Sequence, residues 1–264
     1  MNRLRYRKII HSYILIFGSF FLDEVVRHPN YDLVYTLDDN YGYFNCAMNL
    51  NLGKDSVDDE IQKIEKYFKI RQKSPSISVE QSSRPDNLEA LLLKRGYIND
   101  PSENVVLWTK SLPGKDVVYN DKVKFSIAYD FGAFQDYLYV ANEAWSDIFD
   151  YTHYASSLSK LFTKVYDGVT SMHIVGYVDD NIVCSSTLAL YLDMAHLVNI
   201  SVLPDFRRQG IGSEMIKYAS GEALKKKASE IYICIDEKDE PGSGLLNKLG
   251  FDPEIKQTIF TKKP

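Results

Sequence analysis

At residues 202–213 the chain reads VLPDFRRQGIGS, a glycine-containing loop between an expected strand and an expected helix. The first backbone N–H groups of a helix lack partners inside the helix, and with the positive end of the helix dipole they attract anions. Gly210 and Gly212 carry no side chain where a phosphate must approach, and Arg207 and Arg208 add positive charge. A dinucleotide fingerprint needs a third glycine, which is absent. The stretch therefore predicts a loop that binds phosphate groups.

Strand and helix patterns alternate on both sides of this loop, which predicts a mixed α/β fold. Downstream we expect helices at 131–144, 157–166, 211–226 and 243–249, and strands at 123–128, 172–178, 182–192, 195–203, 231–235 and 257–261. Upstream we expect helices at 57–68 and 88–95, and strands at 33–36, 42–51, 77–80 and 105–109.

The two parts of the chain resemble each other. LLLKRGY at 91–97 aligns with LLNKLGF at 245–251, and in both places a helix and a strand come before and a strand after. A glycine that ends a helix explains either stretch alone, but the shared order favours a duplication. Because the turn-rich LPGKD at 112–116 separates the copies, we expect domains at 1–115 and 116–264.

Composition and charge limit the classes of partner that we expect. The net charge of −5 gives no reason to expect nucleic acid. Cys46, Cys184 and Cys234 show neither disulfide nor metal-ligand spacing, which predicts no metal site and favours a reducing, cytoplasmic compartment. The apolar run 9–22 has helical spacing, so we expect a helix docked on the protein, with a membrane or export signal as the alternative.

Two motifs carry a resemblance to a known family. Arg207-x-x-Gly210-x-Gly212, preceded by Ile200-x-Val202-x-Pro204-x-Phe206, resembles the acyl-CoA pyrophosphate motif of the GNAT superfamily of N-acetyltransferases. LLNKLGF at 245–251 resembles the closing helix and strand of that family. The resemblance covers about residues 123–262, and more loosely the first part as a degenerate copy. It implies two GNAT-like mixed-sheet domains, of which the second binds acetyl-CoA.

The resemblance also implies a site. The main chain of Ile200, Ser201 and Val202 would pair with the pantetheine arm, and the Val202 N–H would donate to the thioester carbonyl oxygen. Asp239 stands where the family often has an Asn that touches pantetheine. The pyrophosphate would be held by Arg207, Arg208, Gln209, Gly210, Ile211, Gly212 and Ser213.

The acid and the base are less clearly marked. The family often has a Glu on the strand before the loop, and His196 occupies that strand here, on the expected face of Ile200 and Val202. Tyr191 and Asp193 are weaker candidates for the base. Leu246 replaces the family's usual Tyr acid, so the CoA thiolate would leave unprotonated, which a thiol pKa of about 8.5 permits.

We therefore expect an N-acyltransferase that moves acetyl from acetyl-CoA to a primary amine by direct attack in a ternary complex. The acceptor would be an amine-bearing small molecule or a peptide. The first copy should not bind CoA, because the acids at 58–60 occupy the first turn of its helix. The main alternative is a non-catalytic acyl-CoA-binding or sensing module, and a membrane-attached scaffold is a third hypothesis.

Overall fold

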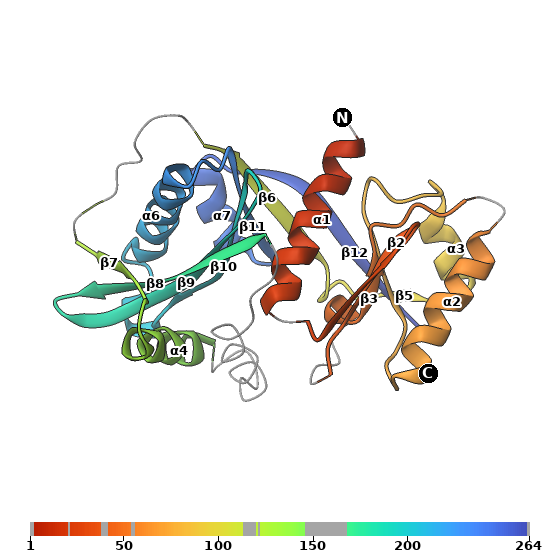
Figure 1. Cartoon of the computed structure of the whole chain (residues 1–264), viewed down its shortest axis with the longest axis horizontal. Coiled ribbons are helices and arrows are strands. Elements are labelled where there is room, and N and C mark those ends of the chain that lie inside the picture. The colour runs from red at the N-terminus through yellow and green to blue at the C-terminus, as the bar shows by residue number, and fades with distance from the viewer. Residues whose placement is uncertain are drawn as a thin grey trace. The chain divides into compact units, whose positions relative to one another are not determined.

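The computed structural model describes residues 3–20, 22–37, 42–53, 56–112, 120, 122–145 and 168–262. Within these ranges the fold is mixed α/β, as the sequence predicts (Figure 1). The helix expected at 157–166 lies outside the described residues.

Two compact units divide the chain. Unit 1 comprises Met1–Leu107, Ile235–Ser243 and Pro253–Pro264, and unit 2 comprises Trp108–Cys234 and Gly244–Asp252. Strand β6 (Val105–Ser111) crosses from one to the other. The division differs from the boundary at 115/116 because the last strand of the chain, β12 (Asp252–Thr261), pairs with a strand of unit 1. That boundary therefore remains a prediction about the two copies.

Unit 2 contains an antiparallel run of strands that ends in one parallel pair. In sheet order these are β7 (Lys124–Ile127), β8 (Val169–Val178), β9 (Asn181–Tyr191), β10 (Met194–Val202) and β11 (Glu230–Asp236). Only β10 and β11 are parallel, because helix α6 (Ile211–Lys225) connects them. Helix α4 (Phe131–Trp145) and α6 cover opposite faces of these strands (Figure 1). Helix α7 (Glu240–Lys248) follows β11.

Unit 1 repeats this order. Strands β1 (Glu24–His28), β2 (Tyr31–Tyr35) and β3 (Cys46–Met48) are antiparallel neighbours, and β3 runs parallel to β4 (Ser76–Val79). Helix α2 (Val57–Ile70) connects the parallel pair, and α3 (Leu88–Lys94) follows β4. Strand β12 pairs with β4 and with the short β5 (Ile98–Asn99). The matching order supports a duplication, and the degenerate character of the first copy remains a prediction.

The first helix docks on unit 1, as expected. Helix α1 (Arg3–Phe20) buries one face, which consists of Tyr6, Ile9, Ile10, Tyr13, Ile14 and Ile16. Arg5 forms an ion pair with Glu254 (3.1 Å), and the Arg7 Nε donates to the Asn49 Oδ1 (3.2 Å). No helix among the described residues has the length and apolarity needed to cross a bilayer.

Candidate functional site

Strand β10 leaves its parallel neighbour after the first third of its length. Its ladder with β11 covers Met194–His196 only, whereas its ladder with β9 continues to Val202 opposite Cys184. Parallel strands that diverge leave an edge of main-chain N–H and C=O groups without a partner strand. In unit 2 this open edge lies directly before the glycine loop.

The orientation of the Val202 peptide follows from its neighbour. The Leu203 N–H donates to the Val183 carbonyl of β9 (2.9 Å). Because alternate residues of a strand direct these groups to opposite edges, the Val202 N–H points away from β9, toward the open edge. The same alternation turns the Ser201 main chain toward β9, where it faces Ser185. This argues against the expected pairing of Ser201 with a pantetheine arm.

A bulge interrupts β10 just before this point. The register with β9 shifts between Val198 and Ser201, so that two residues of β10, Asn199 and Ile200, face one of β9. Asn199 has a left-handed backbone (φ 56°). The bulge breaks the expected face alternation, and Val202 therefore lies on the face opposite to His196.

The loop is braced by its own side chains. The Arg207 Nε donates to the Val202 carbonyl (3.1 Å), and another guanidinium nitrogen of Arg207 donates to the Ala144 carbonyl at the end of α4. The Gln209 amide donates to the Asp205 carbonyl (3.1 Å). Arg207 and Gln209 thus shape the loop, and all three side chains of residues 207–209 are exposed.

The N-terminus of α6 presents free main-chain donors. Gly210 is its N-cap, with φ 83° and no side-chain capping bond. The first helical hydrogen bond is donated by the Glu214 N–H to the Gly210 carbonyl (3.1 Å). The N–H groups of Ile211, Gly212 and Ser213 precede it and have no intrahelical acceptor. These donors, the helix dipole and Arg208 form a site that fits a pyrophosphate.

The two glycines have different roles. A Cβ on Gly210 would meet no atom within 4 Å, so the left-handed backbone, and not crowding, favours glycine there. A Cβ on Gly212 would make ordinary contacts with Leu245 (3.6 Å) and Val202 (3.9 Å). There is therefore space for a side chain at either position, although the backbone of Gly210 disfavours one, and the open surface is available to a ligand.

The candidates for the general base do not reach this edge. His196 is 1% exposed and stacks on Tyr232, and burial lowers its pKa to about 3. An imidazole so buried cannot contact an acceptor amine in this conformation, which argues against His196 as the base. Tyr191 and Asp193 precede β10, and about eight residues at roughly 3.3 Å each separate them from its other end.

Two further expectations concern α7. The Asp239 carboxylate accepts from the Gly242 N–H (2.9 Å), so it caps this helix. Its contact with a cofactor stays a prediction. Leu246, at the position of the family's usual acid, is 2% exposed and has no ionisable group.

Sequence reasoning missed a buried polar chain beneath the bulge. The Asn199 Nδ2 donates to the Tyr137 hydroxyl (3.1 Å), the Tyr137 hydroxyl bonds Thr187 Oγ1 (2.8 Å), and Thr187 Oγ1 bonds His173 Nδ1 (2.9 Å). These residues come from α4, β8, β9 and β10. No local pattern links them, because strand pairing and helix packing alone bring them together.

The corresponding edge of unit 1 is closed. Beyond β3, the Leu52 N–H donates to the Arg84 carbonyl and the Arg84 N–H donates to the Leu50 carbonyl, both at 3.1 Å. The first turn of α2 that follows carries Asp58, Asp59 and Glu60. Main chain therefore occupies the place where unit 2 leaves an open edge, and acids stand where unit 2 has a glycine.

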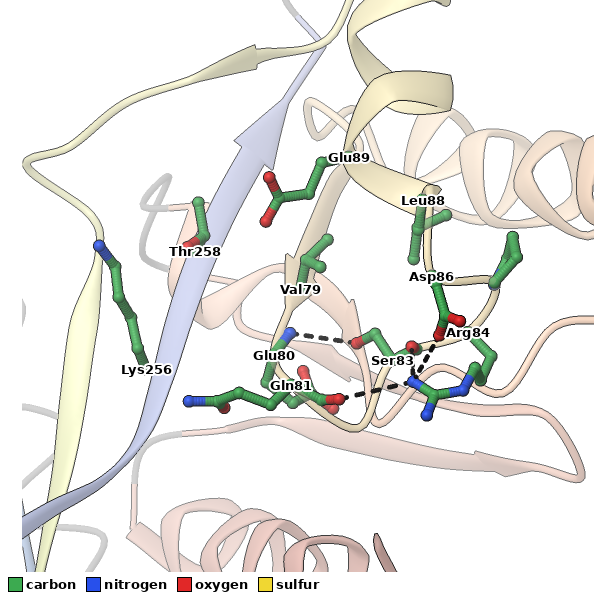
Figure 2. Close-up of a pocket in the computed structure, with 11 residues that line it drawn as sticks. Val79, Glu80, Gln81, Ser83, Arg84, Asp86, Leu88, Glu89, Lys256 and Thr258 are labelled. Atoms are coloured by element: carbon green, nitrogen blue, oxygen red, sulfur yellow. Dashed lines mark hydrogen bonds and ion pairs between the residues drawn. The ribbon is translucent and has the colours of Figure 1, made fainter. Parts of the chain in front are cut away.

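The loop that closes this edge also borders a pocket of about 300 Å³ within unit 1. Figure 2 shows Arg84 bonded to Asp86 (3.0 Å) and to the Ser83 carbonyl (2.7 Å), with Lys256 and Thr258 of β12 on the opposite wall. The Glu80 main-chain N–H donates to the Ser83 hydroxyl (3.1 Å). Arg84 and Asp86 pair with each other, and this lining does not resemble the main-chain donors of α6.

Comparisons with known proteins relate the chain to acetyltransferases. Residues 132–251 match the acetyltransferase (GNAT) family. An N-alpha-acetyltransferase of Sulfurisphaera tokodaii is 30% identical over 92 residues, which cover 34% of this chain. The match spans about half of that relative's length (54%).

Solved structures share the fold of the whole chain. A GCN5-related N-acetyltransferase from Kribbella flavida superposes with a TM-score of 0.71 at 13% identity, covering 98% of this chain and 95% of that one. A tandem GNAT protein from the clavulanic acid biosynthesis pathway superposes with a TM-score of 0.62 at 12% identity, covering 83% of this chain and 76% of that one.

Proposed function

We propose that this chain, whose residues 132–251 match the GNAT acetyltransferase family, transfers an acetyl group from acetyl-CoA to a primary amine by direct attack in a ternary complex. The observation that carries the proposal is the pairing of an open β10 edge with an uncapped α6 N-terminus. Acetyl-CoA bound along this edge would have its pyrophosphate at the N–H groups of the first turn of α6. The acceptor would be an amine-bearing small molecule or a peptide.

The residues that would hold acetyl-CoA follow from the donors described above. The N–H groups of Ile211, Gly212 and Ser213 would bind the pyrophosphate, with Arg208 supplying charge. The main-chain edge from Ile200 to Val202 would carry the pantetheine arm. Bound acetyl-CoA supplies an activated acyl group: the amine nitrogen bonds to the carbonyl carbon, the C–S bond breaks, and CoA leaves as a thiolate.

Val202 would stabilise the transition state of this transfer. Its N–H faces the open edge, where it can donate to the carbonyl oxygen as negative charge develops there. With His196 buried and Leu246 at the acid position, we assign no side chain to the proton transfers. The amine would lose its proton to water, and its own pKa would control the rate.

Calorimetric titration with acetyl-CoA, followed by a panel of amines, tests the proposal. We expect one molecule bound per chain and release of free thiol with at least one amine. Failure of the wild-type protein to bind acetyl-CoA would contradict the proposed site.

The second candidate is a non-catalytic acyl-CoA-binding or sensing module, which the burial of His196 and Leu246 favours. In that case acetyl-CoA would bind, but no amine would accept the acetyl group. Slow hydrolysis of the thioester, equal with and without amines, would then replace transfer.

A further inference from the structure

The hydrogen bonds beneath the bulge have a defined direction from Asn199 to Thr187. The Asn199 amide nitrogen can only donate, so the Tyr137 hydroxyl oxygen accepts and its hydrogen is directed to Thr187. Thr187 can in turn donate to the His173 Nδ1, since burial lowers the pKa of this imidazole to about 4 and keeps it neutral. Tyr137 and Thr187 are fully buried, so water cannot replace the bond between them. Such a satisfied chain favours one local geometry.

The Asn199 end of this series of hydrogen bonds has a strained backbone. Asn199 is a non-glycine residue at φ 56°, within the shift that turns β10 relative to β9. A left-handed residue persists when its surroundings hold it in place, and the bond from Asn199 to Tyr137 is such a restraint. Val202, whose N–H faces the open edge, lies three residues further along the same strand.

We propose that Tyr137 is a positioning residue: through Asn199 it holds the bulge of β10 and so aims the Val202 N–H at the thioester carbonyl. The inference rests on the proposed function. It assigns to α4, a helix remote in sequence from the glycine loop, control over the polarisation of the acyl group.

Tyr137→Phe removes the bond while the ring keeps its packing against Phe134 (5.5 Å between centroids). Asn199→Gly removes the same bond and still accepts a positive φ. The matched control is Tyr177→Phe, which removes a different hydroxyl that joins α4 to β8 through Asp136 (2.9 Å) and does not touch β10.

The readout is the infrared band of the acetyl carbonyl in bound, carbon-13-labelled acetyl-CoA, which needs no acceptor. In the wild type and in Tyr177→Phe, we expect this band at lower frequency than for acetyl-CoA in water. Tyr137→Phe and Asn199→Gly should lose most of that displacement. Where an amine accepts the acetyl group, kcat should fall about tenfold, with KM for acetyl-CoA unchanged within about twofold. The double variant should lose no more than either single variant.

The outcomes separate the two proposals. A wild-type protein that does not bind acetyl-CoA would overturn the proposed function, and this inference with it. The role of Tyr137 alone would be overturned if Tyr137→Phe and Asn199→Gly both kept the wild-type displacement of the band. It would also be overturned if Tyr177→Phe lost that displacement to the same extent. A rise in KM with kcat unchanged would also overturn it.

Discussion

The two strand–loop–helix junctions of this molecule have the same order of elements but different donors. In unit 2, β10 leaves β11 after His196, and Gly210 begins α6 with free N–H groups. In unit 1, Arg84 pairs with the chain beyond β3, and three acids occupy the first turn of α2. The comparison teaches that this topology permits an anion site without creating one. An open edge and a helix start without a side-chain cap, led by Gly210 and Gly212 in place of two aspartates, are both needed.

The largest expected effect comes from a charge at the N-cap of α6. Gly210→Asp should weaken acetyl-CoA binding by more than about 100-fold, because a carboxylate would occupy the anion site and fill the first-turn donors. The fold should persist, since Asp accepts a left-handed backbone better than most residues. Calorimetry measures the change.

The matched control for that variant is Gly96→Asp. Gly96 has the same backbone (φ 86°) and the same open surroundings, but it follows α3 in unit 1. The affinity of the Gly96→Asp variant for acetyl-CoA should equal that of the wild type. Equal losses in both variants would mean that α6 is not the anion site.

The second effect is a pH dependence of stability, which has opposite signs in the two units. Burial lowers the pKa of His196 to about 3 and raises that of Glu80 to about 7. Unfolded His196 binds a proton below its ordinary pKa, so unit 2 should lose stability as pH falls below about 6.5, by about 2 kcal/mol at pH 5. Folded Glu80 keeps its proton longer, so unit 1 should lose about 3 kcal/mol as pH rises from about 4.5 to about 7.

Urea unfolding of His196→Gln and Glu80→Gln between about pH 4.5 and 8 measures both contributions. Relative to the wild type, the first variant should lose less stability toward low pH. The second should lose less stability toward neutral pH. Unchanged slopes in either variant would contradict the assigned burial effect.

A smaller effect separates the two loop arginines. Arg208→Ala should weaken acetyl-CoA binding about five- to tenfold and make it less sensitive to salt, because it removes an exposed charge from the phosphate site. Arg207 bonds two main-chain carbonyls. Arg207→Ala should instead lower the free energy of unfolding by about 1–2 kcal/mol. Titrations at two ionic strengths and urea unfolding distinguish these roles, and a reversed assignment would refute them.

The pH dependence of transfer should carry no signature of His196. If the amine loses its proton to water, kcat/KM rises toward the pKa of the acceptor, without an inflection near 6.5. Changing to an acceptor of lower pKa should move the profile by the same amount. An inflection that stays near 6.5 with every acceptor would point to a histidine base.

The smallest expected effect tests whether charge alone closes unit 1. Removing the two acids in Asp58→Asn/Asp59→Asn should create no second acetyl-CoA site, because Arg84 still occupies the edge beyond β3. Helix α2 should lose only a few tenths of a kcal/mol in stability. If calorimetry showed two molecules of acetyl-CoA bound per chain of this variant, charge alone would close the site in unit 1 and the prediction would be wrong.

Much of the fold was predictable because its signals are local. The glycine loop predicted a helix at 211–226, which the structure has as α6 (Ile211–Lys225), and alternating patterns predicted β8, β9 and β10 to within a few residues. Strand β1 was missed because Glu24 and Arg27 give it a polar pattern, and its partner β2 was placed two residues late. The expected strand at 42–51 is shorter, and the 3-10 turn Gly42–Phe44 precedes β3.

By itself the sequence predicted the glycine loop before α6, the mixed sheet and the resemblance to the GNAT family, because spacing along a helix or strand encodes each of them. Only the tertiary structure decided that His196 is buried, that Val202 and not Ser201 faces the open edge, and that Tyr137 reaches Asn199. A bulge of one residue reverses the face of every residue after it, and no local pattern marks where it falls. The direction of a donor is therefore settled by strand register and helix packing.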